Sequence, residues 1–171
     1  TDLLDALPPG DPRRDCLAGA AIATDVDLDG RVDLVVGCQA SAQPEESTQT
    51  NIVLLQTARG VFSISTDARL GPLESNGVTL ALGSLDVDGD GLLDIAVVND
   101  TFVAGGEETN ALTSGAMLQR CSPEEDCFYT SLGFGLGTQR WGSFMGVGNV
   151  RVDGQGEHLY ITDWGPNRLI K

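Results

Sequence analysis

Residues 85–98 read Leu-Asp-Val-Asp-Gly-Asp-Gly-Leu-Leu-Asp-Ile-Ala-Val-Val. The four aspartates stand at relative positions 1, 3, 5 and 9 of a loop, with a glycine at position 6. Carboxylates this close repel one another unless a cation lies among them. Their oxygens are hard ligands that suit Ca²⁺, and the glycine permits the sharp turn that wraps a backbone around an ion. The stretch therefore predicts a Ca²⁺ loop that leads directly into a β-strand, because the apolar run after it favours a pleated, half-buried surface.

The same pattern occurs 61 residues earlier, where residues 25–36 read Asp-Val-Asp-Leu-Asp-Gly-Arg-Val-Asp-Leu-Val-Val. Two copies with identical spacing, each running into a strand-forming segment, indicate an internal repeat. We expect two Ca²⁺ sites, each using four carboxylates and the backbone carbonyl at position 7. The ligands would be Asp25, Asp27, Asp29, Arg31 (backbone O) and Asp33 in the first loop, and Asp86, Asp88, Asp90, Leu92 (backbone O) and Asp94 in the second.

These loops are not EF-hands. An EF-hand needs a glutamate at position 12, and here that position is Val36 or Val97, inside a predicted strand. The aspartate at position 9 is expected to take the bidentate role instead.

A third unit begins at Trp141 and departs from the pattern. Aligned from Gly148, its position 1 is Arg151, and only Asp153 keeps a ligand type. We predict no Ca²⁺ there. In one interpretation the Arg151 guanidinium replaces the ion and pairs with Asp153 or Glu157; in the other it faces solvent.

Short strand-like segments separated by Gly and Asp turns recur along the chain, without helical periodicity. Four strands per unit of about 61–65 residues is typical of a propeller blade. We therefore expect one all-β domain of β-propeller-type blades, each with four antiparallel strands and, in the intact repeats, a strand–Ca²⁺ loop–strand unit. The expected units are a strand and connector (1–16), repeat 1 (17–76), repeat 2 (77–140) and a degenerate repeat 3 (141–171). The opening strand, residues 3–7, can complete the last blade; a fragment of a longer chain, or blades shared with other chains, are the alternatives.

Charge and composition exclude several classes of protein. The formal net charge is −15, which disfavours nucleic acid and anionic membrane surfaces as partners. Eight of the 25 acidic residues belong to the two loops, so two bound Ca²⁺ ions would bring the net charge to about −11. No run of about 18 apolar residues occurs, so we predict no membrane span.

The four cysteines allow three disulfide connectivities. We favour Cys16–Cys38, which would join the strands on either side of the first loop, and Cys121–Cys127, which would close a polar loop. The alternative is four reduced thiols. Disulfides and Ca²⁺ at millimolar concentration both belong outside the cytosol, so we expect a secreted, extracellular or periplasmic protein.

The pattern Asp-x-Asp-x-Asp-Gly-x-x-Asp-(Leu/Ile)-x-Val resembles FG-GAP/VCBS-type repeats, such as those of integrin α-subunit propellers. Residues 145–148 and 159–169 look more like repeats of ASPIC/UnbV-type secreted proteins. The resemblance covers nearly the whole chain from about Gly19. It implies a calcium-binding β-propeller module, although family propellers have more blades than the three repeats found here.

We do not expect an enzyme. The paired carboxylates are used by the metal loops, and no Gly-x-Ser-x-Gly elbow accompanies the single histidine, His158. The leading hypothesis is a secreted calcium-binding module with a protein-interaction, adhesion or structural role. Its partner would be a protein or glycan, or other copies or chains that complete a propeller. The alternatives are a subunit of an extracellular filament or surface assembly, and a carbohydrate-binding or carbohydrate-active propeller.

Overall fold

The computed structural model describes residues 7–38, 50–74, 78–86 and 90–100, together with the strand backbones at 115–120, 128–133, 144–152, 156–163 and 168–170. Within these residues the strands form three antiparallel sheets with the orders β1-β2-β3-β4, β5-β6-β7-β8 and β9-β10-β11. The strands are β1 (Ala18–Thr24), β2 (Asp33–Cys38), β3 (Ile52–Ala58), β4 (Val61–Ile64), β5 (Val78–Leu85), β6 (Asp94–Asp100), β7 (Gly115–Arg120), β8 (Phe128–Gly133), β9 (Phe144–Val152), β10 (Gly156–Asp163) and β11 (Arg168–Ile170). The prediction of an all-β chain is confirmed.

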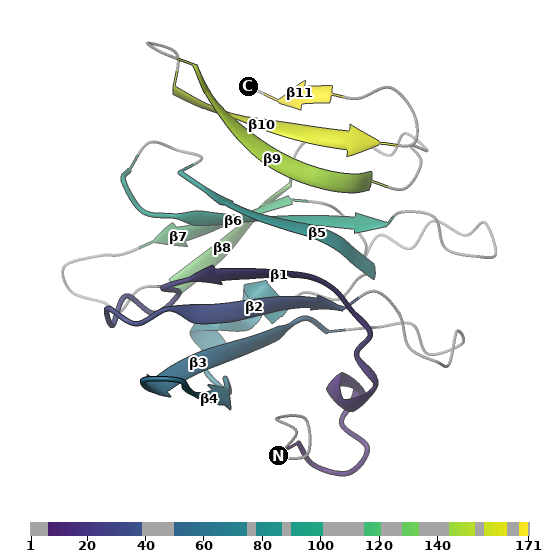
Figure 1. Cartoon of the computed structure of the whole chain (residues 1–171), viewed down its shortest axis with the longest axis vertical. Coiled ribbons are helices and arrows are strands. Elements are labelled where there is room, and N and C mark those ends of the chain that lie inside the picture. The colour runs from purple at the N-terminus through teal and green to yellow at the C-terminus, as the bar shows by residue number, and fades with distance from the viewer. Residues whose placement is uncertain are drawn as a thin grey trace.

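The three sheets lie on one another in chain order, with the first at the bottom and the third at the top of the view (Figure 1). Strands β1 and β2 contact β5, and strands β5 and β6 contact β9. The described strands thus form an open stack, and no closed ring is formed among them.

The first two sheets repeat each other in register as well as in order. Ala21 pairs with Val36 in the first sheet, and Leu82 pairs with Val97 in the second, each 61 residues further on. A bulge also recurs at the same place, between Ala18 and Ala20 and again between Thr79 and Ala81. The 61-residue spacing seen in the sequence is therefore a structural repeat in this part of the chain.

The main core lies between the first and second sheets. It consists of buried side chains from both sheets, from the first Asp loop and from a 3₁₀ helix, η4 (Ala68–Glu74): Val26, Val35, Val53, Leu70, Leu73, Leu82, Ile95 and Val97. Leu70 and Leu73 face the same way because a 3₁₀ helix turns once in three residues. Burial of each contributes about 1.5–3 kcal/mol. The sequence interpretation missed this helix, which links the first repeat to the second.

Two contacts fix how closely the first two sheets approach. A Cβ added to Gly37 would lie 2.5 Å from Cγ2 of Thr79, so only glycine fits at this point of β2. Next to it, the buried Asn51 side chain accepts hydrogen bonds through Oδ1 from the Cys38 amide (3.1 Å) and from the Thr79 hydroxyl (2.8 Å). These residues join both sheets through the Asn51 side-chain oxygen, whereas the buried Nδ2 of Asn51 has no hydrogen-bond acceptor in the part of the chain that the structure describes.

The predicted disulfide between Cys16 and Cys38 is present, with an S–S distance of 2.06 Å and a Cα–Cα distance of 5.2 Å. It ties the segment before β1 to the end of β2. That segment contains a short 3₁₀ helix, η2 (Pro12–Asp15), capped by the Asp11 carboxylate, which also pairs with Arg13. Cys121 and Cys127 lie outside the described residues, so their pairing remains a prediction.

The opening strand predicted at residues 3–7 lies almost wholly outside the described residues, and its pairing with the last sheet remains a prediction. Leu7 itself is buried, and its carbonyl accepts a hydrogen bond from Arg14 (2.6 Å). Leu7 and Pro8 line a hollow beside Phe62 and Ile64 of β4, in the first sheet. No helix in the described part of the chain is long and apolar enough to span a membrane.

Candidate metal centre

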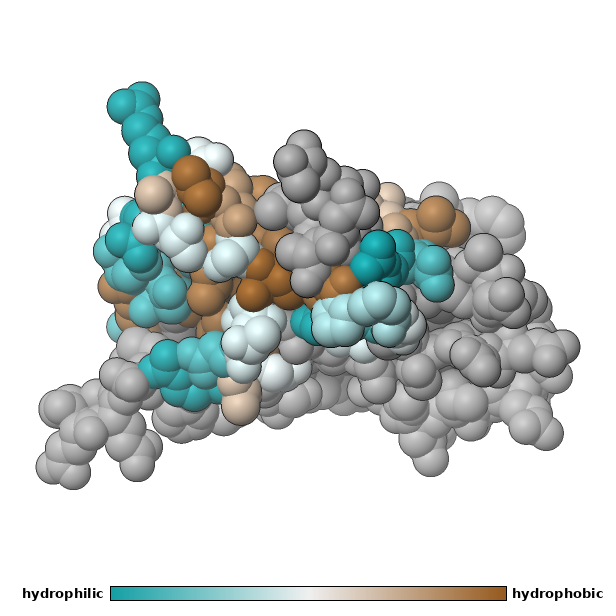
Figure 2. Space-filling model, turned by 90° about the horizontal axis from the view of Figure 1, so that it is seen from below, coloured by the Kyte–Doolittle hydropathy of each residue, from teal (hydrophilic) through white to brown (hydrophobic). Residues whose placement is uncertain are grey.

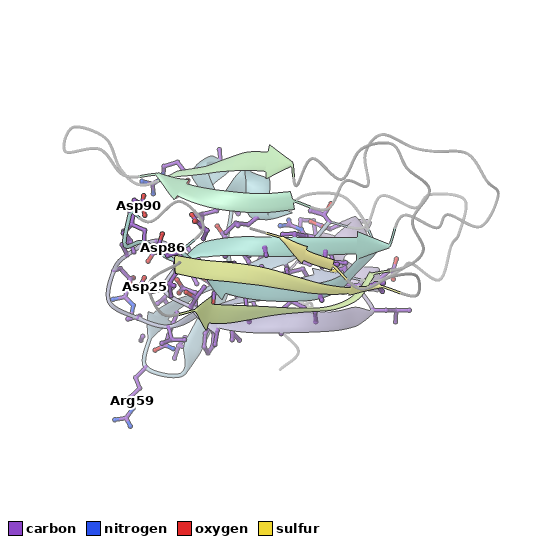
Figure 3. The ribbon with its side chains drawn as sticks, turned by 90° about the horizontal axis from the view of Figure 1, so that it is seen from above. Asp25, Arg59, Asp86 and Asp90 are labelled. Carbon is purple, nitrogen blue, oxygen red and sulfur yellow. A yellow bond between two sulfur atoms is a disulfide. The ribbon has the colours of Figure 1, made fainter. Side chains whose placement is uncertain are left out.

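Each of the first two sheets carries an Asp loop between its first two strands, and the two loops lie at the same edge of the stack. Figure 3 shows Asp25 of the first loop and Asp86 and Asp90 of the second on this edge. Gly30 and Gly91, at position 6, have φ angles of +85° and +89°, a region that glycine enters without steric cost. Leu28, at position 4, also has a positive φ of 58°. The second loop has a glycine, Gly89, at that position.

The two loops share their internal hydrogen bonds. In the first, the Gly30 amide donates to Oδ2 of Asp25 (2.9 Å) and the Arg31 amide donates to Oδ1 of Asp29 (2.8 Å). In the second, the Gly91 amide donates to Oδ2 of Asp86 (3.0 Å) and the Leu92 amide donates to Oδ1 of Asp90 (2.8 Å). The carboxylates at positions 1 and 5 are thus held in the same way in both copies.

Three carboxylates of the first loop converge. One oxygen from each of Asp25, Asp27 and Asp29 lies within 4.8 Å of the other two. Burial raises the pKa of Asp27, and the negative charges of Asp33, Asp29 and Asp25 act in the same direction, against a lowering by the Asp29 amide that donates to it. The loop therefore gathers negative charge that a cation would relieve.

Asp33, predicted as the bidentate ligand, is placed differently from the other three. It is fully buried and is not part of the converging group. Its Oδ2 accepts a hydrogen bond from the Val26 amide (3.0 Å), and its Oδ1 accepts one from the Gln56 amide (2.8 Å). Asp33 therefore connects the first loop to the start of β2 and to β3. Its counterpart in the second repeat, Asp94, is also fully buried.

Arg31 and Gln56 form a second connection between the first loop and β3. The Arg31 guanidinium pairs with the Asp29 carboxylate, and its Nε donates to the Gln56 carbonyl. The Gln56 side chain donates from Nε2 to the Val32 carbonyl (3.0 Å). The sequence interpretation named the Arg31 backbone but missed the role of Gln56. A signal was present, because a glutamine ends the apolar run of the equivalent strand at Gln119.

In the second loop, Asp86, Asp90, Leu92 and Asp94 are described, whereas Asp88 lies outside the described residues. In the third unit, β9 and β10 stay paired up to Val152 and Gly156. Arg151 lies within β9, directly opposite Glu157 on β10. This register suits the predicted pair with Glu157, while Asp153 lies outside the described residues.

Antiparallel sheets that repeat in register, each with an Asp loop between its first two strands, define an all-β repeat protein. Comparison with protein families gives the type of repeat: residues 25–97 match the model of the FG-GAP-like repeat. This segment is an FG-GAP-like repeat, which confirms the resemblance drawn from the aspartate pattern. No curated protein matches the chain significantly.

Proposed function

We propose that this chain is a calcium-binding repeat module in which the two Asp loops each hold one Ca²⁺. The observation that carries the proposal is the convergence of the Asp25, Asp27 and Asp29 carboxylate oxygens within 4.8 Å of one another. The second loop supports it, because its carboxylates at positions 1 and 5 are held by the same backbone hydrogen bonds.

The residues present fit the chemistry of Ca²⁺. Ca²⁺ takes six to eight oxygen ligands, in which carboxylates and backbone carbonyls combine. The first loop offers Asp25, Asp27, Asp29 and the Arg31 carbonyl. Each oxygen of Asp33 accepts one amide hydrogen bond and retains a further lone pair. Bound Ca²⁺ would supply positive charge among carboxylates that otherwise repel one another.

The two loops are expected to differ in affinity. In the first, the Arg31 side chain already pairs with Asp29, so Ca²⁺ must compete with the Arg31 guanidinium for the Asp29 carboxylate. The second loop has Leu92 at that position and carries no arginine of its own. We therefore expect tighter Ca²⁺ binding at the second loop, and tighter binding at the first when Arg31 is replaced by leucine.

We further propose that the module is secreted and that its role is interaction, adhesion or structural support. The Cys16–Cys38 disulfide supports an oxidising location. Ca²⁺ bound between the first two strands of a sheet would stabilise the fold by mass action, by about 2.7 kcal/mol at a concentration of 100 times its Kd.

Calorimetric titration of the chelator-treated protein with Ca²⁺ tests the proposal, together with thermal unfolding in Ca²⁺ and in excess chelator. We expect two binding events and a higher melting temperature with Ca²⁺. Asp25→Asn should remove one event and Asp86→Asn the other. Asp67→Asn is the matched control, because Asp67 pairs with Arg69 away from both loops. Identical melting curves with Ca²⁺ and with chelator would contradict the proposal.

A further inference from the structure

The segment before β1, residues 7–16 and here called the cap, lies against the outer face of the first sheet. This face is the one opposite the main core, and its apolar side chains are Leu34, Val36, Cys38, Ile52, Leu54, Phe62 and Ile64. Cys16, at one end of the cap, packs against this group, and Leu7, at the other end, is buried beside β4. Figure 1 shows the cap beneath the first sheet, at the end of the stack.

The segment that occupies the same place in the second repeat is held from both sides. The residues 61 positions after the cap are 68–77 and include η4, which precedes β5 as the cap precedes β1. The η4 helix contacts β3 of the first sheet and β8 of the second, and its Leu70 and Leu73 are 2% and 0% exposed. The cap has the first sheet on one side, and among the described strands no sheet lies on its other side.

The cap also packs less closely on its sheet than η4 does. A hollow of about 390 Å³ lies between the cap and β4, lined by Leu7, Pro8, Asp11, Arg13, Phe62, Ser63, Ile64 and Thr66. The amides of Asp11, Arg14 and Cys16 donate to carbonyls within the cap itself. Seen from below the first sheet, hydrophobic residues are visible at the surface of the molecule (Figure 2). The cap is thus folded on itself and covers the outer face in part.

The Cys16–Cys38 disulfide supplies the attachment that η4 obtains from its second sheet. The positions 61 residues after the two cysteines are Gly77 and Asn99, so the second repeat has no cysteine pair at this place. The bond therefore belongs to the end of the stack, where packing comes from one side. Cys38 is fully buried, whereas Cys16 is half-buried beside the exposed Leu17, so a reductant should reach the bond from the Cys16 side.

We propose that the disulfide holds the cap over the outer face and that a dithiol reductant releases the cap while the first two sheets stay stacked. A thiolate of the dithiol attacks Sγ of Cys16, and the sulfur of Cys38 leaves and takes up a proton. The second thiol of the reductant then closes a disulfide within the reductant and frees Cys16 as a thiol. The protein gains two electrons and two protons, which the dithiol loses. Because the main core lies on the other face of the first sheet, reduction should uncover the outer face without unfolding the stack.

Limited trypsin digestion of the full chain before and after treatment with dithiothreitol tests this proposal, with the cleavage sites identified by mass spectrometry. Arg13 and Arg14 lie in the cap, Arg59 is exposed at the turn between β3 and β4, and Arg69 precedes the buried Leu70 of η4. We expect reduction to raise the rate of cleavage after Arg13 and Arg14 by roughly tenfold or more, since proteolysis follows the population of the open form. The rates after Arg59 and Arg69 should stay the same, and binding of an apolar dye should rise.

Two sets of variants assign the effect to this disulfide. Dithiothreitol would also reduce a bond between Cys121 and Cys127, so the Cys121→Ser/Cys127→Ser protein is the matched control and should respond as the wild type does. The Cys16→Ser/Cys38→Ala protein should show the released pattern without any reductant. If that protein fails to fold, reduction of the folded wild type still tests the proposal.

Three outcomes would overturn the proposal. The first is an unchanged rate of cleavage after Arg13 and Arg14 in the reduced wild type, because the cap would then be held by other contacts. The second is a rate after Arg69 that rises as much as the rates in the cap, because the disulfide would then hold the whole stack together. The third is loss of the response in the Cys121→Ser/Cys127→Ser protein, because a different bond would then control the cap.

Discussion

Replacement of Asp33 separates the structural part of the first Asp loop from the part that we propose binds Ca²⁺. Asp33 is fully buried, and its two carboxylate oxygens accept the Val26 and Gln56 amides at 3.0 Å and 2.8 Å. In Asp33→Ala both amides lose their acceptor. In Asp33→Asn one oxygen remains, but the new amide group is itself a donor and faces a donor at one of the two contacts.

The expected loss of stability follows from these two contacts. A hydrogen bond to a charged group contributes about 1.5–3 kcal/mol, so two of them contribute roughly 3–6 kcal/mol. Loss of the carboxylate offsets part of this, because a buried charge near the acidic loop is removed as well. We expect Asp33→Ala to lower the free energy of unfolding by about 3 kcal/mol and Asp33→Asn by about 2 kcal/mol.

Urea unfolding in excess chelator measures this loss without any contribution from Ca²⁺. Under these conditions Asp25→Asn should lower stability much less than the Asp33 substitutions, because the Asp29 and Gly30 amides that donate to Asp25 are exposed and the substitution also removes repulsion within the loop. The contrast between the two aspartates is the decisive readout. Equal stability of Asp33→Ala and the wild type in chelator would refute the assignment of a structural role to the buried carboxylate.

Three further predictions concern single contacts. Gln56→Ala removes the hydrogen bond to the Val32 carbonyl and should lower the free energy of unfolding by about 1 kcal/mol, measured in urea; no change would show that this bond contributes nothing. The pKa of Asp27 is raised in the folded protein, so the Asp27 carboxyl stabilises the fold most at low pH, where it is protonated. In excess chelator, the free energy of unfolding of the wild type should therefore fall relative to that of Asp27→Asn as the pH rises through this pKa. A pH-independent difference between the two proteins would contradict this. Gly37→Ala places a Cβ against Thr79, whose hydroxyl is held by a hydrogen bond, and should lower stability by about 1–3 kcal/mol in thermal unfolding, whereas a neutral outcome would mean that the sheets can separate at no cost.

Local patterns in the sequence predicted most of the fold. The apolar run after each Asp loop predicted β2 and β6, because β-branched residues favour strands and the turn before them was marked by aspartate and glycine. The Cys16–Cys38 pair was predicted from its position on either side of the first loop. Both signals act over short distances along the chain, or repeat at a fixed spacing.

Contacts between sheets were not predicted, because they depend on residues far apart in sequence. The η4 helix lies outside the repeated strand pattern. Its Leu70 and Leu73 belong to the core because the first two sheets stack on each other. Nothing in the sequence around Asn51 marks it as a contact between sheets. Its role as an acceptor for Cys38 and Thr79 depends on how closely the second sheet approaches.

The placement of Asp33 shows how strand geometry and ligand geometry act together in this motif. Asp33 is the first residue of β2, and side chains alternate along a strand, so Asp33 shares a face with Val35 and Gly37. That face is directed into the core against the second sheet, and therefore the carboxylate at position 9 must be buried wherever a strand starts at this position. Asp94 is buried for the same reason at the start of β6.

The other three aspartates precede the strand and remain nearer to solvent. A buried carboxylate needs donors, and in the first loop the amides of Val26 and Gln56 supply them before any ion is considered. The spacing of the motif thus serves two requirements at once, because one carboxylate fastens the loop to the sheet while the other three converge where a cation can reach them.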